Sequence, residues 1–173
     1  VVLTPHWQTY IGNHFLGLER FRNISVDPIF PNLFRFHHDI EVDVELSEAM
    51  QRSAEEAGII SMMMRNPDFR VDYGTIVSCH MLNPEWDKPI VTISSNRSTH
   101  YYSDEVMNEQ ASALGRAISK AILESGKKVV LVASHSLSHR HFVTEAPLPE
   151  DMSREHIYNH SQYVWDMKVI EMM

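Results

Sequence analysis

Three histidines follow one another closely after a short apolar run near residue 130. The run covers residues 129–133, and His135, His139 and His141 come within the next eight positions. We expect the run to be a β-strand buried on both faces, and ligands of α/β sheets bind beyond the carboxyl ends of such strands. Imidazoles placed there can transfer protons or bind a metal near neutral pH. The segment is therefore the first candidate for chemistry.

Another histidine, His6, comes after Pro5 at the end of a short apolar strand expected at residues 1–3. It could be a metal ligand or a proton-transfer group, or a histidine that is simply hydrogen-bonded at a strand end. His139 has an equivalent position after its own strand, which strengthens the functional interpretation. Both interpretations of His6 remain open on the residues alone.

Other combinations of side chains are weaker candidates. His135 and His139 have the spacing of helical zinc ligands, but no glutamate follows His135 as in His-Glu-x-x-His. Ser136 or Ser138 beside His139 could form a serine hydrolase, but the Gly-x-Ser-x-Gly turn is absent. Tyr73 could be an acid or a hydrogen-bond donor, although such a tyrosine more often packs with a satisfied hydroxyl. Residue chemistry alone indicates an α/β enzyme with a histidine-lined site.

The composition is that of a globular domain. The chain has 173 residues, 43% of them hydrophobic and 22% charged, which predicts a single domain with a real core. A net charge of −8 argues against a nucleic-acid surface, and no apolar run is long enough to cross a membrane. The lone Cys79 excludes a disulfide framework within the chain and suits the cytoplasm. The sequence opens inside a strand and closes inside a helix, so we expect truncation at both ends.

Hydrophobic spacing predicts alternating strands and helices. Helices are expected at residues 45–57, at 103–125 between a Ser103 cap and Gly126, and through Trp165 after a Ser153 cap. Strands are expected at residues 59–64 and 89–95, an irregular region at 8–38, and either a strand or a buried helix at 76–82. This alternation predicts an α/β fold with a central, mostly parallel sheet flanked by helices.

Two of the histidine segments resemble motifs of the class III extradiol dioxygenases. Pro5-His6-Trp7 is similar to the segment that carries the second iron-ligating histidine of that family. Leu137-Ser138-His139 is similar to its Gly-Gly-Leu-Ser-His motif, although serine and histidine residues stand here where the glycines are usual. Four further segments look closest to the catalytic β subunits of 2-aminophenol 1,6-dioxygenases: residues 26–32, 63–67, 69–75 and 149–153.

The resemblance implies a fragment of the class III extradiol dioxygenase fold that opens an aromatic ring with O2 at non-haem Fe(II). Such iron is held by two histidines and a glutamate. His6 matches one of the histidines, and the other two ligands are expected before Val1 and beyond Met173. The resemblance further implies that His139 is the acid–base residue. Tyr73 stands where other branches carry a histidine and would donate a hydrogen bond to substrate or oxygen.

The same resemblance implies partners and leaves an alternative. The expected partners are a small aromatic substrate of aromatic-compound catabolism, O2, and a related α subunit in a hetero-oligomer, with neither nucleic acid nor membrane. The alternative is a non-catalytic structural subunit, or a metal-free relative, that supports a catalytic partner. The presence of both His6 and His139 favours the enzyme.

Overall fold

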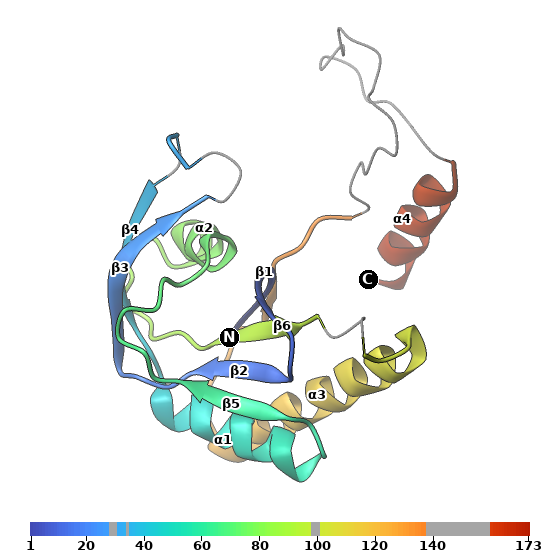
Figure 1. Ribbon diagram of the computed structural model, residues 1–173, viewed down its shortest axis with the longest axis horizontal. Coiled ribbons are helices and arrows are strands. Elements are labelled where there is room, and N and C mark those ends of the chain that lie inside the picture. Colours follow the sequence, from blue (N-terminus) through green and yellow to red (C-terminus); the bar gives the residue numbers. More distant parts are fainter. Residues whose placement is uncertain (28–30, 34, 98–100, 138–159) are drawn as a thin grey trace, which may run out of the picture. The chain divides into compact units, whose positions relative to one another are not determined.

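The computed structural model describes residues 1–27, 31–33, 35–97, 101–137 and 160–173 (Figure 1). These residues divide into two compact units, Val1–Ser134 and His135–Met173. The described part of the first unit contains two sheets and three helices. The described part of the second contains the helix α4 (His160–Met172), which confirms a last helix through Trp165, whereas Ser153 lies outside the described residues. Among the described residues, none of the helices has the length and apolar character needed to cross a membrane.

A five-stranded sheet forms the centre of the first unit. Its strand order is β5-β2-β6-β1-β7. The β1–β6, β1–β7 and β2–β5 pairs are parallel, and only β2–β6 is antiparallel. The mostly parallel sheet predicted from the sequence is thus confirmed. The strands are β1 (Val2–Thr9), β2 (Asn13–Leu16), β5 (Ser61–Met64), β6 (Thr92–Asn96) and β7 (Val132–Ala133).

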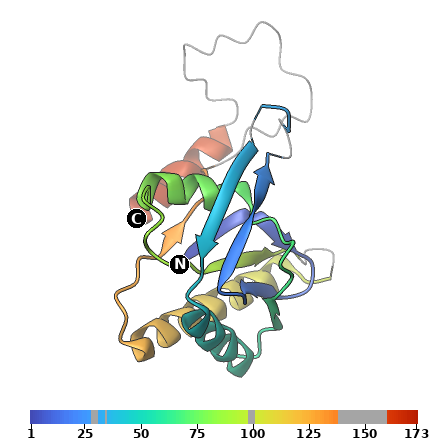
Figure 2. The same cartoon turned by 90° about the vertical axis from the view of Figure 1, so that its left-hand side faces the viewer.

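A long antiparallel hairpin replaces the irregular region expected at residues 8–38. It consists of β3 (Arg20–Val26) and β4 (Arg35–Glu41) and lies beside α2 (Figures 1 and 2). Phe21 and Ile40 are buried and paired, while the neighbouring Arg20 and Asp39 are exposed and form an ion pair. This alternation has the period of two that strands require. The prolines near residue 30 exclude a long helix but not two strands on either side of them.

Two helices cover one face of the sheet, where the sequence predicted them. α1 (Val44–Glu56) begins at the Asp43 cap, and α3 (Asp104–Ser125) begins at the Ser103 cap and ends at Gly126, whose φ of 66° is left-handed. Their inward side chains form one apolar core with the sheet. That core consists of Phe15, Leu46, Met50, Ala54, Ile59, Val91, Ile93, Leu114, Ile118 and Ala121.

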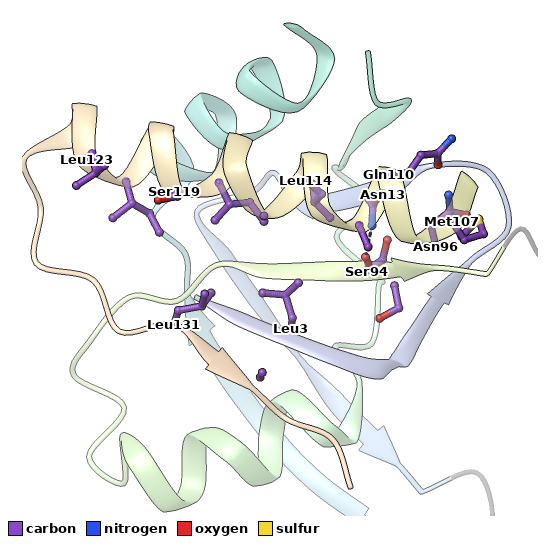
Figure 3. Close-up of a pocket in the computed structure, with 16 residues that line it drawn as sticks. Leu3, Asn13, Ser94, Asn96, Met107, Gln110, Leu114, Ser119, Leu123 and Leu131 are labelled. Atoms are coloured by element: carbon purple, nitrogen blue, oxygen red, sulfur yellow. Dashed lines mark hydrogen bonds between the residues drawn. The ribbon is translucent and has the colours of Figure 1, made fainter. Parts of the chain in front are cut away.

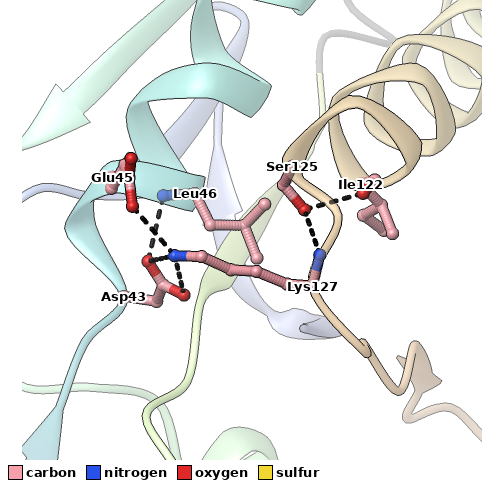
Figure 4. A network of polar contacts seen from close by, with 6 residues as sticks. All are labelled: Asp43, Glu45, Leu46, Ile122, Ser125 and Lys127. Atoms are coloured by element: carbon pink, nitrogen blue, oxygen red, sulfur yellow. Dashed lines mark hydrogen bonds and ion pairs between the residues drawn. The ribbon is translucent and has the colours of Figure 1, made fainter.

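Lys127, just after α3, ties the end of that helix to the start of α1 (Figure 4). Its Nζ donates to both carboxylate oxygens of Asp43 at 2.9 and 2.8 Å and to Glu45 Oε2 at 3.1 Å. Asp43 Oδ1 also accepts from the backbone N–H of Leu46 at 3.0 Å, so one carboxylate both caps α1 and binds the lysine. The two helices on this face are therefore joined at one end by charge as well as by apolar packing.

The helix α2 (Tyr73–Leu82) covers the opposite face together with the hairpin. Residues 76–82, for which the sequence allowed either a strand or a buried helix, are therefore helical. Its core includes Val2, Trp7, Leu16, Phe21 and Ile76. Cys79 lies in the same core, and burial raises the pKa of its thiol to about 11, so the thiol stays protonated at neutral pH.

The apolar run at residues 129–133 is not a strand buried on both faces. Only Val132–Ala133 pair as β7, and β1 is the one strand beside them in the described part of the chain. Val130 and Leu131 are 74% and 56% exposed. Sequence alone cannot distinguish an edge position from a central one, because both accept an apolar run of this length. The expectation was therefore wrong in its burial and in its length.

Candidate functional site

His6 stands on a bulge in β1, an inner strand of the five-stranded sheet. Leu3 pairs with Ile93 of β6, and the next pair along the two strands is Gln8 with Ser95. Between these pairs β1 has four residues and β6 has one, so β1 carries three extra residues, and the expected end of the strand at Leu3 is instead an interruption. Bulges re-aim side chains and often lie next to active sites. Here Pro5 and His6 are exposed while Thr4 and Trp7, at the two ends of the bulge, are buried.

Hydrogen bonds to the carboxylate of Asp72 hold this bulge against the start of α2. Asp72 caps the helix, and its Oδ1 accepts from the backbone N–H of Thr75 at 3.0 Å. The same Oδ1 accepts from the Thr4 hydroxyl at 2.9 Å, and Thr4 Oγ1 in turn accepts from the backbone N–H of His6 at 2.9 Å. Ser95 of β6 donates to the Thr4 carbonyl at 2.8 Å. Helix start, bulge and neighbouring strand are thus connected through one threonine.

The structure brings Tyr73 and His6 together, as two of the three site residues expected from the sequence. Their ring centroids are 4.2 Å apart and the ring planes are inclined by 42°. Burial, and then the carboxylates of Asp27 and Asp72, raise the pKa of the Tyr73 phenol above its ordinary value. The phenol therefore stays protonated at neutral pH and can donate a hydrogen bond beside the imidazole.

Gly74 allows this close approach. A Cβ at this position would lie 2.6 Å from His6 Cδ2 and 2.8 Å from Thr4 Oγ1. These distances are well inside van der Waals contact, so a side chain at residue 74 would displace the imidazole. Asp72, Thr4 and Gly74 were all missed as site residues by sequence reasoning. The available signal was an aspartate three residues before Thr75, the pattern of a helix N-cap, and it could be used only once residues 76–82 were known to be helical.

The third expected residue, His139, lies outside the described residues, as do Ser138 and His141. What the structure describes is the chain leading toward them. The Ser134 N–H donates to the Leu3 carbonyl at 2.8 Å, and Ala133 is the register partner of Leu3. Because β1 and β7 are parallel, the chain leaves β7 beside the residue at which β1 begins its bulge. His135, in the second unit, is exposed, and its Nδ1 lies 3.0 Å from the Ser136 carbonyl oxygen.

Two other histidines of the first unit, His14 and His38, are half-buried and buried. The His14 ring meets Trp7 edge-on with centroids 6.5 Å apart, and burial lowers its pKa. His38 is only 4% exposed, and burial likewise lowers its pKa. Its Nδ1 lies 3.2 Å from Ser25 Oγ, and its Nε2 has no partner in the described part of the chain. Both imidazoles are therefore held in the neutral form near pH 7.

Among the described residues, no group of three or more histidine, cysteine, aspartate or glutamate side chains could hold a metal ion. His6 nevertheless suits a single ligand position. Its side chain is exposed, and no hydrogen bond joins a ring nitrogen of His6 to another described residue. A neutral imidazole with a free nitrogen is an ordinary ligand for iron and zinc. The described site thus fits one metal ligand, with a phenol beside it.

A cavity of about 500 Å³ lies elsewhere, between α3 and the sheet (Figure 3). Its walls are mostly apolar and include Leu3, Leu114 and Leu131, with Asn13 and Ser94 at one end. Neither His6 nor Tyr73 lines it. This cavity is on the α3 side of the sheet, whereas Tyr73 belongs to the helix on the opposite side, so cavity and candidate site are separate features.

Comparison with known proteins identifies the family. The family described as the catalytic LigB subunit of aromatic ring-opening dioxygenase matches residues 1–173. The chain belongs to this family. The fold and the class III extradiol resemblance expected from the sequence are both confirmed by this match.

Named relatives of this LigB-family chain agree with the assignment. It is 51% identical over all 173 residues to the 2-aminophenol 1,6-dioxygenase beta subunit of Pseudomonas sp, covering 57% of that protein. It is 29% identical over 152 residues, 87% of the chain, to the corresponding alpha subunit, covering 54% of it. It is 25% identical over 154 residues, 88% of the chain, to the 3,4-dihydroxyphenylacetate 2,3-dioxygenase of Escherichia coli, covering 53% of it. The chain therefore spans just over half the length of these relatives.

Proposed function

We propose that this chain is part of the catalytic subunit of an Fe(II)-dependent extradiol dioxygenase. The substrate would be 2-aminophenol or a related aminophenol or catechol, opened by O2 in cytoplasmic aromatic catabolism. The observation that carries the proposal is His6. Its exposed imidazole stands on the β1 bulge against Tyr73, in a chain that is 51% identical to a 2-aminophenol 1,6-dioxygenase beta subunit.

In this proposal His6 is one ligand of the iron, and the remaining ligands lie outside the described residues. Iron held there would supply the centre at which the aromatic substrate and O2 are brought together. Tyr73, protonated at neutral pH, donates a hydrogen bond from Oη to the substrate or to oxygen. His139 accepts a proton from the bound substrate and returns it later, the acid–base role that histidines commonly take in enzymes.

The proposal extends to the assembly. The matches to an alpha subunit and a beta subunit support a hetero-oligomer with a related α subunit. A non-catalytic supporting subunit is the second candidate function, because the chain also matches the alpha subunit at 29% identity. The higher identity to the beta subunit, 51%, favours the catalytic role.

The direct test is oxygen consumption. The protein is loaded anaerobically with Fe(II), mixed with 2-aminophenol or catechol, and then exposed to air while O2 uptake and ring opening are followed. We expect O2 uptake that requires both iron and substrate and that a chelator abolishes. If neither 2-aminophenol nor any catechol causes O2 consumption, the proposed function is wrong. Labelling by a fluorophosphonate would instead favour the serine hydrolase built on Ser138.

The role of His139 has its own test. We expect His139→Ala to leave Fe(II) binding intact and to lower turnover by about 10²-fold or more, the usual scale of acid–base catalysis. Iron content and kcat are measured on the same preparation. His135→Ala, four residues earlier, is the matched control and should keep most of the activity. Full activity in His139→Ala would remove His139 from the mechanism.

A further inference from the structure

We propose that Thr4 and Asp72 are positioning residues for His6, and that Gly74 provides the space in which the imidazole is held. This inference rests on the proposed function, because it explains how the proposed iron ligand is kept in place. It concerns three residues that touch neither substrate nor metal in the proposal. They act through the backbone of His6 and through the volume left beside its ring.

The bulge explains why the backbone of His6 needs contacts from other residues. Four residues of β1 stand opposite one residue of β6, so the regular pairing between strands is lost where His6 lies. A backbone released from its ladder needs other partners to remain in one conformation. The Thr4 side chain supplies one, because its Oγ1 accepts the His6 N–H at 2.9 Å.

Asp72 keeps the Thr4 hydroxyl in the orientation that this contact needs. Thr4 donates to Asp72 Oδ1 at 2.9 Å, so its lone pairs are turned toward the His6 N–H. Asp72 is itself fixed by two bonds from Thr75, from the backbone N–H at 3.0 Å and from the hydroxyl at 2.7 Å. Thr4 and Thr75 are 2% and 0% exposed, so water cannot readily replace these contacts. Charge-assisted hydrogen bonds of this kind are stronger than neutral ones.

The ring of His6 is confined from two sides. Tyr73, next to Asp72, lies 4.2 Å from it between centroids. Gly74, the following residue, would touch His6 Cδ2 at 2.6 Å if it carried a Cβ. Three successive residues at the start of α2 therefore set the backbone and the ring of His6. Groups that orient a metal ligand in this way typically change metal affinity by about 10–100-fold when they are removed.

The test compares two buried threonines on adjacent strands. Thr4→Val removes both hydrogen bonds of the hydroxyl, and Thr4→Ser restores them. Thr92→Val is the matched control, because Thr92 is 0% exposed and its Oγ1 has no hydrogen-bond partner in the described part of the chain. We expect Thr4→Val to weaken Fe(II) binding by about 10–100-fold. Thr4→Ser and Thr92→Val should bind Fe(II) like the wild type.

A second pair tests the space beside the ring. Gly74→Ala places a Cβ against His6, whereas Gly115→Ala in α3 places one where no atom lies within 4 Å. The readout is the nuclear Overhauser contact between the His6 and Tyr73 rings in metal-free protein, with Fe(II) affinity measured in parallel. Gly74→Ala should lose the contact and bind Fe(II) more weakly, and Gly115→Ala should change neither. If Thr4→Val does not fold, Gly74→Ala and Thr4→Ser still decide the question.

The outcomes separate this inference from the proposed function. Wild-type Fe(II) affinity with an unchanged ring contact in both Thr4→Val and Gly74→Ala would overturn the positioning role. If the wild type itself binds no Fe(II), the proposed function fails. The positioning role is then decided by the contact between the His6 and Tyr73 rings in metal-free protein alone. Loss of this contact in Thr4→Val but not in Thr92→Val would still support positioning, and its retention in Thr4→Val would overturn it.

Discussion

The two faces of the five-stranded sheet are closed in different ways. Under α1 and α3 an apolar core of side chains such as Phe15, Met50 and Leu114 predominates, and α1 also buries Ser47 and Ser53. Under α2 and the hairpin, an apolar core surrounds buried polar groups, among them Thr4 and His38. Buried polar groups cost free energy unless they are hydrogen-bonded. Both faces bury polar groups, and the difference lies in what those groups hold: on the α2 face, Thr4 binds the backbone of His6 in the candidate site.

Phe15→Ala should have the largest effect on folding. Phe15 is 0% exposed and lies in the core under α1 and α3, so its truncation removes apolar contacts and leaves a cavity. We expect a loss of about 3–5 kcal/mol in the free energy of unfolding, measured by urea denaturation. Fe(II) affinity per folded molecule should stay unchanged. A loss of Fe(II) affinity in the folded variant would show that the α1/α3 face also contributes to the candidate site.

His6→Ala should have the opposite pattern, with a small effect on folding and a large effect on Fe(II) binding. Its side chain is exposed, so the unfolding free energy should change by about 0.5 kcal/mol or less. Fe(II) binding should weaken by at least about 100-fold, beyond what loss of an outer partner causes. Anaerobic metal titration measures this, with His37→Ala on the exposed side of β4 as control. Unaltered binding in His6→Ala would remove the proposed ligand from the site.

The pH dependence of stability should come from the α2 face. Burial lowers the pKa of His38, so the folded state resists a proton that the unfolded state accepts below about pH 6.5. The unfolding free energy should therefore have its full value above pH 6.5. It should fall by up to about 1.4 kcal/mol per pH unit per histidine as the pH decreases toward the lowered pKa. His14, whose pKa is also lowered by burial, adds to the slope.

His38→Leu should flatten that slope in urea denaturation between pH 5 and 8. His37→Leu changes the neighbouring exposed histidine and should leave the slope as it is. Equal slopes in the wild type and His38→Leu would show that the buried imidazole does not couple folding to protons.

The smallest expected effect belongs to the α1/α3 face. Lys127→Met removes the ion pairs to Asp43 and Glu45 and should cost about 0.5–1 kcal/mol, as partly exposed pairs do. The difference from wild type should shrink in about 1 M salt, where such pairs are screened. Lys128→Met is the adjacent control, since the structure shows Lys128 in none of the ion pairs among the described residues. A salt-independent difference would point to lost packing of the lysine stem instead.

The helices α1 and α3 could be predicted from sequence because their signals are local. Apolar residues recur at helical spacing, and Ser103 and Gly126 mark the ends of α3 as its cap and its left-handed stop. The hairpin was missed because buried positions on both of its strands carry polar residues, Ser25 and His38, and β7 was overextended because burial depends on neighbouring strands. Neighbours distant in sequence leave no local signal.

For the candidate site, the sequence could name residues but not their surroundings, and the roles of those residues stay predictions. His6 and Tyr73 stand in recognisable segments, and the structure brings them together. Thr4, Asp72 and Gly74 could not be found, because their roles depend on a bulge whose existence requires the register between β1 and β6. His139 remains a prediction, since it lies outside the described residues.

The bulge also divides β1 into two parts that pair with β6 and a short segment between them. Val2 and Leu3 on one side, and Gln8 and Thr9 on the other, keep the alignment with β6. Thr4 and Trp7 anchor the intervening segment in the interior, and only Pro5 and His6 face outward. Because residues on both sides of the bulge keep their register with β6, we expect substitutions at Pro5 or His6 to leave the pairing of the two strands unchanged. If His6 is the proposed iron ligand, variants at residues 5 and 6 would change the ligand while the alignment of β1 with β6 is kept.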